Sequence, residues 1–211
     1  MLVIFVYMKR LYSSLIFIGL FVLIGCYDQK PADPDPVEDT YPIGLVSTRL
    51  GDMYFWLYDE TPNHKAKFIE LAEDNHYDQF TMNRVIRNFL IQGGCPDSVQ
   101  YFEGAPFLLD PEFHDSLGHT YGALGMGRDD NPGKQSNACQ FYVVCKEAAL
   151  PTVDSNYMIC GMIIKGADVL EDIENERTNS KDKPITDIPL NVSIKRFTEK
   201  ALLDSLGFQI P

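Results

Sequence analysis

Apolar and polar residues alternate in short runs along most of the chain beyond residue 42, a pattern typical of half-buried β-strands. Two such runs flank a turn at Leu50-Gly51-Asp52, and Met53, Phe55 and Leu57 then share one strand face. Further strands are predicted at 82–86, 89–93, 123–127, 140–145, 157–164 and 190–197.

Three segments show helical periodicity instead. Thr61-Pro62 is typical of a helix start, because a capping residue precedes a proline in the first turn. A second helix is predicted at 167–176 and a short terminal helix at 198–206. The residues predicted to face inward are Ala66, Ile69 and Ala72 in the first helix and Val169, Leu170 and Ile173 in the second. Many short strands with only two main helices predict a mainly β fold, a closed antiparallel barrel.

Residues 1–25 have the layout of a secretory signal, since Lys9 and Arg10 precede an apolar run that ends at Gly25. A small residue followed by Cys26 resembles the processing site of a bacterial lipoprotein, in which Cys26 is lipidated and becomes the first mature residue. The alternative is an uncleaved membrane helix, for which the apolar run is short. Translation could also start at Met8, because residues 1–7 place apolar residues ahead of the basic pair.

Residues 26–42 interleave prolines with acidic residues, so this segment can bury little apolar surface. We expect it to be an extended tether that holds a folded domain, 43–197, away from a lipid surface, with a C-terminal helical extension at 198–211. The formal net charge of the chain is −12. This acidity argues against a nucleic-acid partner, which needs a basic protein surface.

Four cysteines follow Cys26, at Cys95, Cys139, Cys145 and Cys160. None of their spacings is the C-x-x-C of a metal site. An exported domain permits disulfides, but a chain with 45% hydrophobic residues can build a core without them. We therefore favour buried free thiols.

The most informative motif is Arg-Val-Ile-Arg-Asn-Phe-Leu-Ile-Gln-Gly-Gly at 84–94, followed later by Gln-Phe-Tyr at 140–142. Five further fragments are Tyr77-Asp78, Glu112-Phe113, His119-Thr120, Leu124-x-Met126, and Val153-Asp154 before Gly161. The motif and these fragments follow one another in the order and spacing of the cyclophilin family, which the chain resembles over 43–197. The resemblance implies an eight-stranded antiparallel barrel capped by two α-helices, and peptidyl-prolyl cis-trans isomerase activity.

Prolyl isomerisation makes and breaks no covalent bond, but twisting the peptide removes its resonance against a barrier of about 18–20 kcal/mol. The twist localises a lone pair on the proline nitrogen, so a donor aimed there stabilises the transition state more than the planar ground state. Arg84 suits this role, because guanidinium is permanently charged and presents a rigid fork of donors. No cofactor is needed for this chemistry.

The resemblance also implies the other site residues. Phe89 and Gln92 are expected to act with Arg84, Phe89 in the apolar floor under the proline ring and Gln92 on the substrate backbone. The expected substrate-binding residues are Leu90, Gly127, Arg128, Tyr142, Val153 and Tyr157. Leu90, Tyr142 and Val153 would line the proline pocket. The backbone of Gly127 and Arg128 would hold an extended peptide, and Tyr157 would lie beside the ring.

Five positions depart from the residues that are usual in the family. Asn83 replaces histidine, Met82 and Tyr142 replace phenylalanine, Leu90 replaces methionine, and Thr152 replaces tryptophan. The missing tryptophan weakens any expectation of binding to cyclosporin-type ligands. The added hydroxyl of Tyr142 could alter which residue is accepted before proline.

Two competing signals point to metal sites. Asp129-x-Asn131-x-Gly133 resembles a calcium loop, but Lys134 and Gln140 stand where such a loop needs glycine and glutamate. The four histidines lack close metal spacing and are expected to be surface or hydrogen-bonded loop residues: His64, His76, His114 and His119. No metal site is therefore expected.

The sequence thus predicts a monomeric prolyl isomerase of the cell envelope, anchored through lipid on Cys26 and acting on proline-containing segments of exported proteins. The sequence does not distinguish the periplasmic side from the cell surface. The substituted pocket leaves open a catalytically weak or inactive module that binds proline segments as a chaperone or assembly factor.

Overall fold

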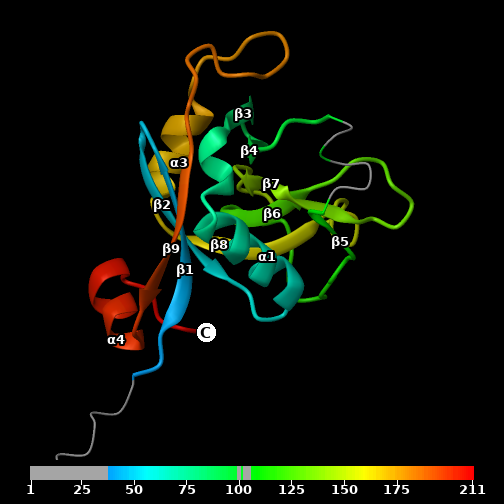
Figure 1. Ribbon diagram of the computed structural model, residues 1–211. Coiled ribbons are helices and arrows are strands. Elements are labelled where there is room, and N and C mark those ends of the chain that lie inside the picture. The colour runs from blue at the N-terminus through cyan, green and yellow to red at the C-terminus, as the bar shows by residue number, and fades with distance from the viewer. Residues whose placement is uncertain (1–37, 99–100, 102–105) are drawn as a thin grey trace, which may run out of the picture. The chain divides into compact units, whose positions relative to one another are not determined.

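Nine β-strands form one antiparallel sheet in the computed structural model, which describes residues 38–98, 101 and 106–211 (Figure 1). The predicted signal peptide, Cys26 and most of the predicted tether lie outside the described residues. The strands are β1 (Tyr41–Thr48), β2 (Gly51–Leu57), β3 (Thr81–Ile86), β4 (Leu90–Gly94), β5 (Leu108–Leu109), β6 (Ala123–Gly127), β7 (Ser136–Val144), β8 (Met158–Lys165) and β9 (Asn191–Phe197). The predicted strands are all present, with ends displaced by a few residues.

The sheet follows the order β3-β4-β7-β6-β8-β2-β1-β9, and the short β5 pairs with β7. It curls until its two ends approach, but they meet only in an isolated bridge between Thr81 and Pro189. The prediction of a closed barrel was therefore overstated, and the sheet is a curled half-barrel. That bridge consists of two backbone hydrogen bonds, from the amide of Met82 to the carbonyl of Ile188 and from the amide of Leu190 to the carbonyl of Phe80, and no strand ladder continues from it in the described residues.

Two helices cap the curled sheet, α1 (Pro62–Glu73) against β7 and β9 and α3 (Ala167–Glu174) against β2 and β4. Both starts match the prediction, and Val169, Leu170 and Ile173 of α3 are buried as expected. The predicted stripe of α1 was wrong only at Ala66, which is exposed: Ala72 is buried and Ile69 packs partly buried against the core, and the other buried residues are His64, Phe68 and Leu71. The larger Phe68 and Leu71 pack into the main core inside the curled sheet. None of the helices in the described part of the chain is long and apolar enough to cross a membrane.

Large side chains from the strands and from the two capping helices fill the inside of the curled sheet and form the core. Met53, Phe55 and Leu57 of β2 are fully buried, as their alternation predicts. Phe68 of α1 packs edge-on against Phe141 of β7, and Tyr77 packs against both rings. This cluster fixes β7 from behind, so that the other face of β7 is available for a site.

The C-terminal extension packs on the outer face of the sheet. It comprises α4 (Glu199–Ala201) and a wider helical turn, Leu202–Leu206, which ends at the predicted residue and is followed by Gly207. Leu202 is buried, and Phe208 lies 5.3 Å from Trp56 between ring centroids. The extension therefore covers Trp56, which alternation turns away from the main core.

The cysteine prediction was half correct. Cys145 and Cys160 are buried free thiols, and burial raises the pKa of each to about 12. Cys95 and Cys139, however, form a disulfide, with their Cα atoms 5.5 Å apart. The strand pairing explains the correction, because β4 and β7 are antiparallel neighbours and Gly94 pairs with Gln140. Sequence spacing alone does not show that pairing.

Candidate active site

One row of residues crosses four neighbouring strands and carries the polar groups of the site. Arg84 on β3 pairs with Gln92 on β4, Gln92 pairs with Tyr142 on β7, and Tyr142 pairs with Gly125 on β6. Residues directly opposite each other in a sheet point to the same face. The register thus places the guanidinium, the amide and the phenol side by side.

This row forms part of a groove of about 310 Å³ on the face opposite the core. All nine residues that the sequence suggested around the proline site line it: Arg84, Phe89, Leu90, Gln92, Gly127, Arg128, Tyr142, Val153 and Tyr157. The groove is also lined by Asp97, His119, Gln140, Val144 and Leu150. Thr152, at the position of the usual tryptophan, is exposed and does not line it.

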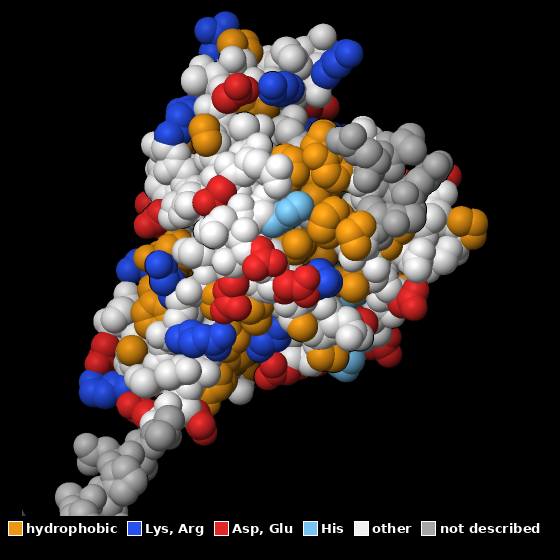
Figure 2. Space-filling view, viewed as in Figure 1, with side chains coloured by type: hydrophobic (Ala, Val, Ile, Leu, Met, Phe, Trp, Pro, Cys, Tyr) orange, Lys and Arg blue, Asp and Glu red, His pale blue; other side chains and the backbone are white. Residues whose placement is uncertain are grey.

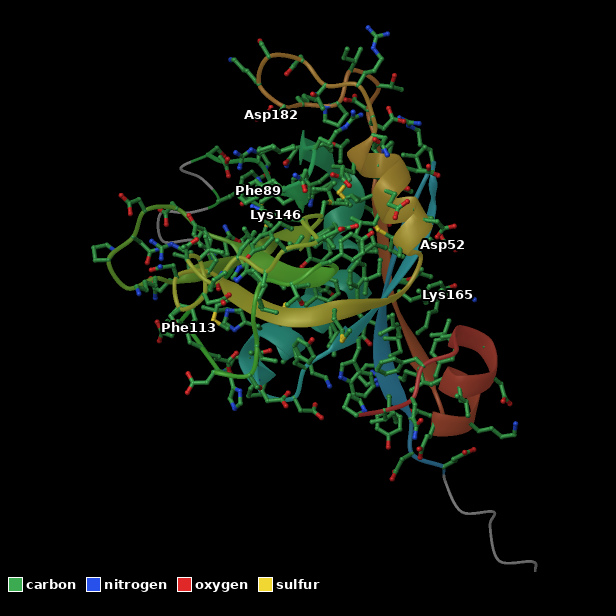
Figure 3. All side chains as sticks on the ribbon, turned by 180° about the vertical axis from the view of Figure 1, so that it is seen from behind. Asp52, Phe89, Phe113, Lys146, Lys165 and Asp182 are labelled. Carbon is green, nitrogen blue, oxygen red and sulfur yellow. A yellow bond between two sulfur atoms is a disulfide. The ribbon has the colours of Figure 1, made fainter. Side chains whose placement is uncertain are left out.

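Arg84 is held loosely enough to meet a ligand. Its side chain is 42% exposed, and its ion pair with Asp182 is long, with Nε 4.0 Å from Oδ2. Asp182 belongs to the loop between α3 and β9, which projects beyond Phe89 in Figure 3 and carries Lys and Arg side chains at its tip in Figure 2. A half-exposed pair of this length contributes little, about 0–1 kcal/mol. The guanidinium is therefore free to exchange this partner for a ligand.

A bulge in β3 turns Arg84 toward the groove. The register shifts between Met82 and Arg84, so that Met82 enters the core while Arg84 faces outward beside Gln92. Asn83 is the extra residue, and its side chain donates to the carbonyl of Gly94 at 3.0 Å. The residue that replaces the family's usual histidine thus ties the bulge to β4.

The floor of the groove is apolar. Phe89 lies in the turn between β3 and β4, and its carbonyl accepts from the amide of Cys145 at 2.9 Å, which fixes the turn to the end of β7. Leu90 pairs with Val144 across β4 and β7 on the groove side. Val153 completes the wall from the loop before β8. Such a floor suits a small apolar ring and excludes water from the groups above it.

Two glycines of β6 make room for groove side chains. A Cβ at Gly125 would lie 2.2 Å from Cζ of Tyr142, and one at Gly127 would lie 2.0 Å from Oε1 of Gln140. Any larger residue at either position would push these side chains into the groove. Gly127 is thus required for close approach, besides its expected backbone role.

Tyr142 is buried, and its hydroxyl is already hydrogen-bonded within the protein. It lies 2.7 Å from Nε2 of His119, and Nδ1 of His119 lies 2.6 Å from Oδ1 of Asp154. Burial lowers the pKa of His119, against the raising effect of Asp154, and burial raises the pKa of Tyr142 well above its ordinary value. The expectation that this hydroxyl selects the residue before proline therefore has no geometric support.

Arg128 braces the loop that carries two site residues. Its Nη1 donates to the carbonyl of Asn156 at 2.9 Å, and its guanidinium lies over the ring of Tyr157 at 5.3 Å. Tyr157 is 39% exposed at the rim of the groove. The side chain of Arg128 thus has a structural task, which leaves its backbone for the expected contact with substrate.

Sequence reasoning missed five groove residues. Gln140 and Val144 flank Tyr142 at alternate positions of β7, so strand periodicity alone could have added them. Leu150, Asp97 and His119 come from loops, where no periodicity applies. The side chain of Gln140 donates to Oδ1 of Asp97 at 2.8 Å and to the carbonyl of Cys95 at 2.9 Å, which links the disulfide to the groove.

A second polar cluster imitates a hydrolase triad but is closed. Nδ1 of His64 lies 2.5 Å from Oε2 of Glu112, and Nε2 lies 2.6 Å from the hydroxyl of Ser136. His64 and Ser136 have no exposed surface, so no substrate can reach the hydroxyl. The cluster instead ties α1 to β7 and to the loop before β6. His64 is therefore a hydrogen-bonded core residue of a helix, whereas the sequence predicted a surface or loop histidine.

Comparison with known proteins identifies the class. The family model described as "Cyclophilin type peptidyl-prolyl cis-trans isomerase/CLD" matches residues 44–194. The peptidyl-prolyl cis-trans isomerase CYP71 of Arabidopsis thaliana is 33% identical over 72% of this chain, which spans only 24% of that protein. A Staphylococcus saprophyticus protein assigned to the same class is 29% identical, over 70% of this chain and 88% of its own length.

A solved structure agrees with this assignment. The cyclophilin-type isomerase of Cryptosporidium parvum, crystallised in the presence of the dipeptide Ala-Pro, superposes with a TM-score of 0.65. It is 25% identical, and the match covers 72% of this chain and 98% of the other. The chain belongs to the cyclophilin-type peptidyl-prolyl cis-trans isomerases. Its reaction class is therefore the rotation of X-Pro peptide bonds.

Proposed function

We propose that the groove binds an extended proline-containing segment with the proline ring on the Phe89 floor, and that Arg84 catalyses the rotation. The guanidinium donates to the proline nitrogen when the bond twists, while Gln92 holds the carbonyl that does not turn. The donor acts in a site partly shielded from water, where such an interaction is stronger than in bulk solvent.

The observation that carries this proposal is the cross-strand register of Arg84, Gln92 and Tyr142 above an apolar floor. A fixed charge beside an apolar hollow is the combination that rotation needs, since one group stabilises the lone pair and the other immobilises the ring. The structure of the Cryptosporidium parvum isomerase in the presence of the dipeptide Ala-Pro supports a proline peptide as the ligand class.

Replacing Arg84 with alanine tests the mechanism. We expect kcat/KM on a proline peptide to fall about 10²- to 10³-fold, the usual effect of removing one transition-state donor. The melting temperature should change little, because the ion pair of Arg84 is long and half-exposed. Arg87→Ala is the matched control, since Arg87 is exposed three residues away and does not line the groove.

Two results would contradict this proposal in different ways. An Arg84→Ala variant with the full wild-type rate would refute the assigned mechanism but leave the activity intact. A wild-type chain that binds the peptide saturably without accelerating its isomerisation would favour the alternative, a module that holds proline segments.

We also propose that the chain is a lipid-anchored protein of the cell envelope and that its substrates are exported polypeptides. The lipoprotein-like junction before Cys26 supports the anchor. The disulfide between Cys95 and Cys139 supports export, because disulfides persist mainly in oxidising compartments.

A further inference from the structure

Three polar side chains form a connected series that ends at the wall of the groove. Oδ1 of Asp154 accepts from the backbone N–H of His119 at 3.0 Å and lies 2.6 Å from its Nδ1. Nε2 of His119 lies 2.7 Å from the hydroxyl of Tyr142, and the two rings are stacked with 10° between their planes. His119 is 3% exposed and Tyr142 is 5% exposed, so solvent reaches the series mainly through Asp154.

The partners fix the position of each proton. Nδ1 faces a carboxylate and therefore carries the proton, which leaves Nε2 as an acceptor for the Tyr142 hydroxyl. Burial lowers the pKa of His119, which favours this neutral imidazole. The only other acceptor near the hydroxyl in the described structure is the carbonyl of Met158, at 3.4 Å. The hydroxyl is thus committed to His119 and is not presented to a ligand.

The ring that this bond holds is a wall of the groove, and its position is tightly bounded on one side. Gly125 lies directly beneath it, where a Cβ would come within 2.3 Å of the hydroxyl oxygen. Backbone thus limits the ring from below, while His119 limits its rotation from the side. If the hydroxyl bond is lost, Nε2 remains buried without a partner, and either the imidazole turns or water enters. Either change would move the wall.

We propose that His119 is a positioning residue of the groove, which orients Tyr142 through its hydroxyl and thereby sets the affinity for prolyl segments. This inference rests on the proposed function of the groove. The wall contacts the proline ring in both the planar and the twisted state, so its loss weakens both equally and raises KM. Arg84, in contrast, acts on the twisted state and governs kcat.

The test compares Tyr142→Phe, His119→Leu and the double variant in the full chain, with an Ala-Pro peptide as substrate. We expect KM to rise about five- to tenfold in each single variant while kcat stays within about twofold. The double variant should be no worse than either single one, because no buried group is then left unpaired. The ¹⁵N resonance of His119 Nε2 should shift in Tyr142→Phe, as an acceptor that loses its donor would.

Tyr121→Phe is the matched control. It also removes a buried tyrosine hydroxyl, but this one has no hydrogen-bond partner in the described structure and lies outside the groove. KM should therefore stay at the wild-type value. A KM and an Nε2 resonance that do not change in Tyr142→Phe would overturn the proposal, as would a loss confined to kcat.

The design separates this inference from the proposed function. If the wild-type chain shows no isomerase activity, the proposed function fails, and the dissociation constant of the same peptide then replaces KM. An affinity unchanged by Tyr142→Phe would still refute the positioning role. If His119→Leu does not fold, as judged by circular dichroism, Tyr142→Phe decides alone because its packing is nearly unchanged.

Discussion

At the residue scale, the protonation of three histidines that are buried or partly buried affects the stability of the folded domain. His64 hydrogen-bonds Glu112 and Ser136, and His119 hydrogen-bonds Asp154 and Tyr142. Burial lowers the pKa of both histidines, although the neighbouring carboxylates act in the opposite direction. Burial also lowers the pKa of His76. All three groups are therefore expected to be neutral in the folded chain at pH 7.

This arrangement predicts a loss of stability in mild acid. An unfolded histidine binds its proton near pH 6.5, whereas the folded ones bind it only at lower pH, so the unfolded state takes up more protons in that interval. The free energy of unfolding should be highest above pH 6.5 and fall between pH 7 and pH 5. The lowered pKa of Glu112 acts below this window, since that carboxylate ordinarily titrates near 4.5.

Urea unfolding at half-unit pH steps measures this loss. His119→Leu should flatten the slope, because one buried imidazole no longer titrates. The control is His114→Leu, since His114 is exposed in the loop before β6. A free energy of unfolding that does not change between pH 7 and pH 5 would contradict the prediction.

At the residue scale, the sequence predicted which side chains line the groove better than which partners they contact. Arg84, Gln92 and Tyr142 could be selected because their types suit the reaction and their order matched a family. The partnership of His119 with Tyr142 could not be predicted, because it joins a loop to a strand across 23 residues. Ala66 was misplaced because a small apolar residue gives no clear signal for either face of α1.

At the element scale, a disulfide beside the groove reinforces the pairing of β4 with β7. The disulfide joins Cys95 and Cys139 just beyond the paired residues Gly94 and Gln140. His76 lies beside it, with Nε2 3.4 Å from Sγ of Cys139. Gln140, whose amide donates to the carbonyl of Cys95, carries this constraint into the groove.

Reduction of this disulfide should weaken the domain without unfolding its core. The loop that it closes has a sequence separation of 44, for which the chain-entropy model gives about 4 kcal/mol as the stabilisation. We expect the midpoint of urea unfolding to fall on reduction and KM for a proline peptide to rise, because Gln140 loses a fixed neighbour. Urea titration with and without reductant checks both effects when paired with the isomerase assay.

The matched control is the double variant Cys95→Ser with Cys139→Ser, which should not respond to reductant. Cys145 and Cys160 should not respond either, since both are free thiols and have no disulfide for the reductant to cleave. If the unreduced, denatured domain titrates with all four thiols free, the disulfide is absent and the prediction fails.

Element positions were predictable where one face of a segment is buried and the other is not. Alternation identified β2 by Met53, Phe55 and Leu57, and the Thr61-Pro62 start fixed the beginning of α1. Closure of the sheet was not predictable, because it depends on how residues far apart meet at the Thr81–Pro189 seam. The disulfide escaped prediction for the same reason, since it follows from strand register.

At the scale of the whole molecule, two features of the chain bear on where it works. The formal net charge of −12 disfavours polyanionic partners. The folded part has a disulfide, which an oxidising compartment would preserve. Both features support the proposal of a protein that acts outside the cytosol.

Replacement of Cys26 by serine tests the proposed anchor in the full chain, expressed in a bacterium. The unchanged chain should carry acyl chains on an N-terminal Cys26. It should therefore partition into detergent, because each buried CH₂ of an acyl chain contributes about 0.8 kcal/mol to membrane binding. The Cys26→Ser variant should lose the lipid and keep its leader.

Cys145→Ser, which replaces a cysteine of the folded domain, is the control and should be lipidated normally. A Cys26→Ser variant that partitions like the wild type, with no lipid on Cys26 of the wild type, would establish an uncleaved membrane helix instead. Mass spectrometry of the N-terminal peptide distinguishes these results, because lipidation and leader retention change its mass in different ways.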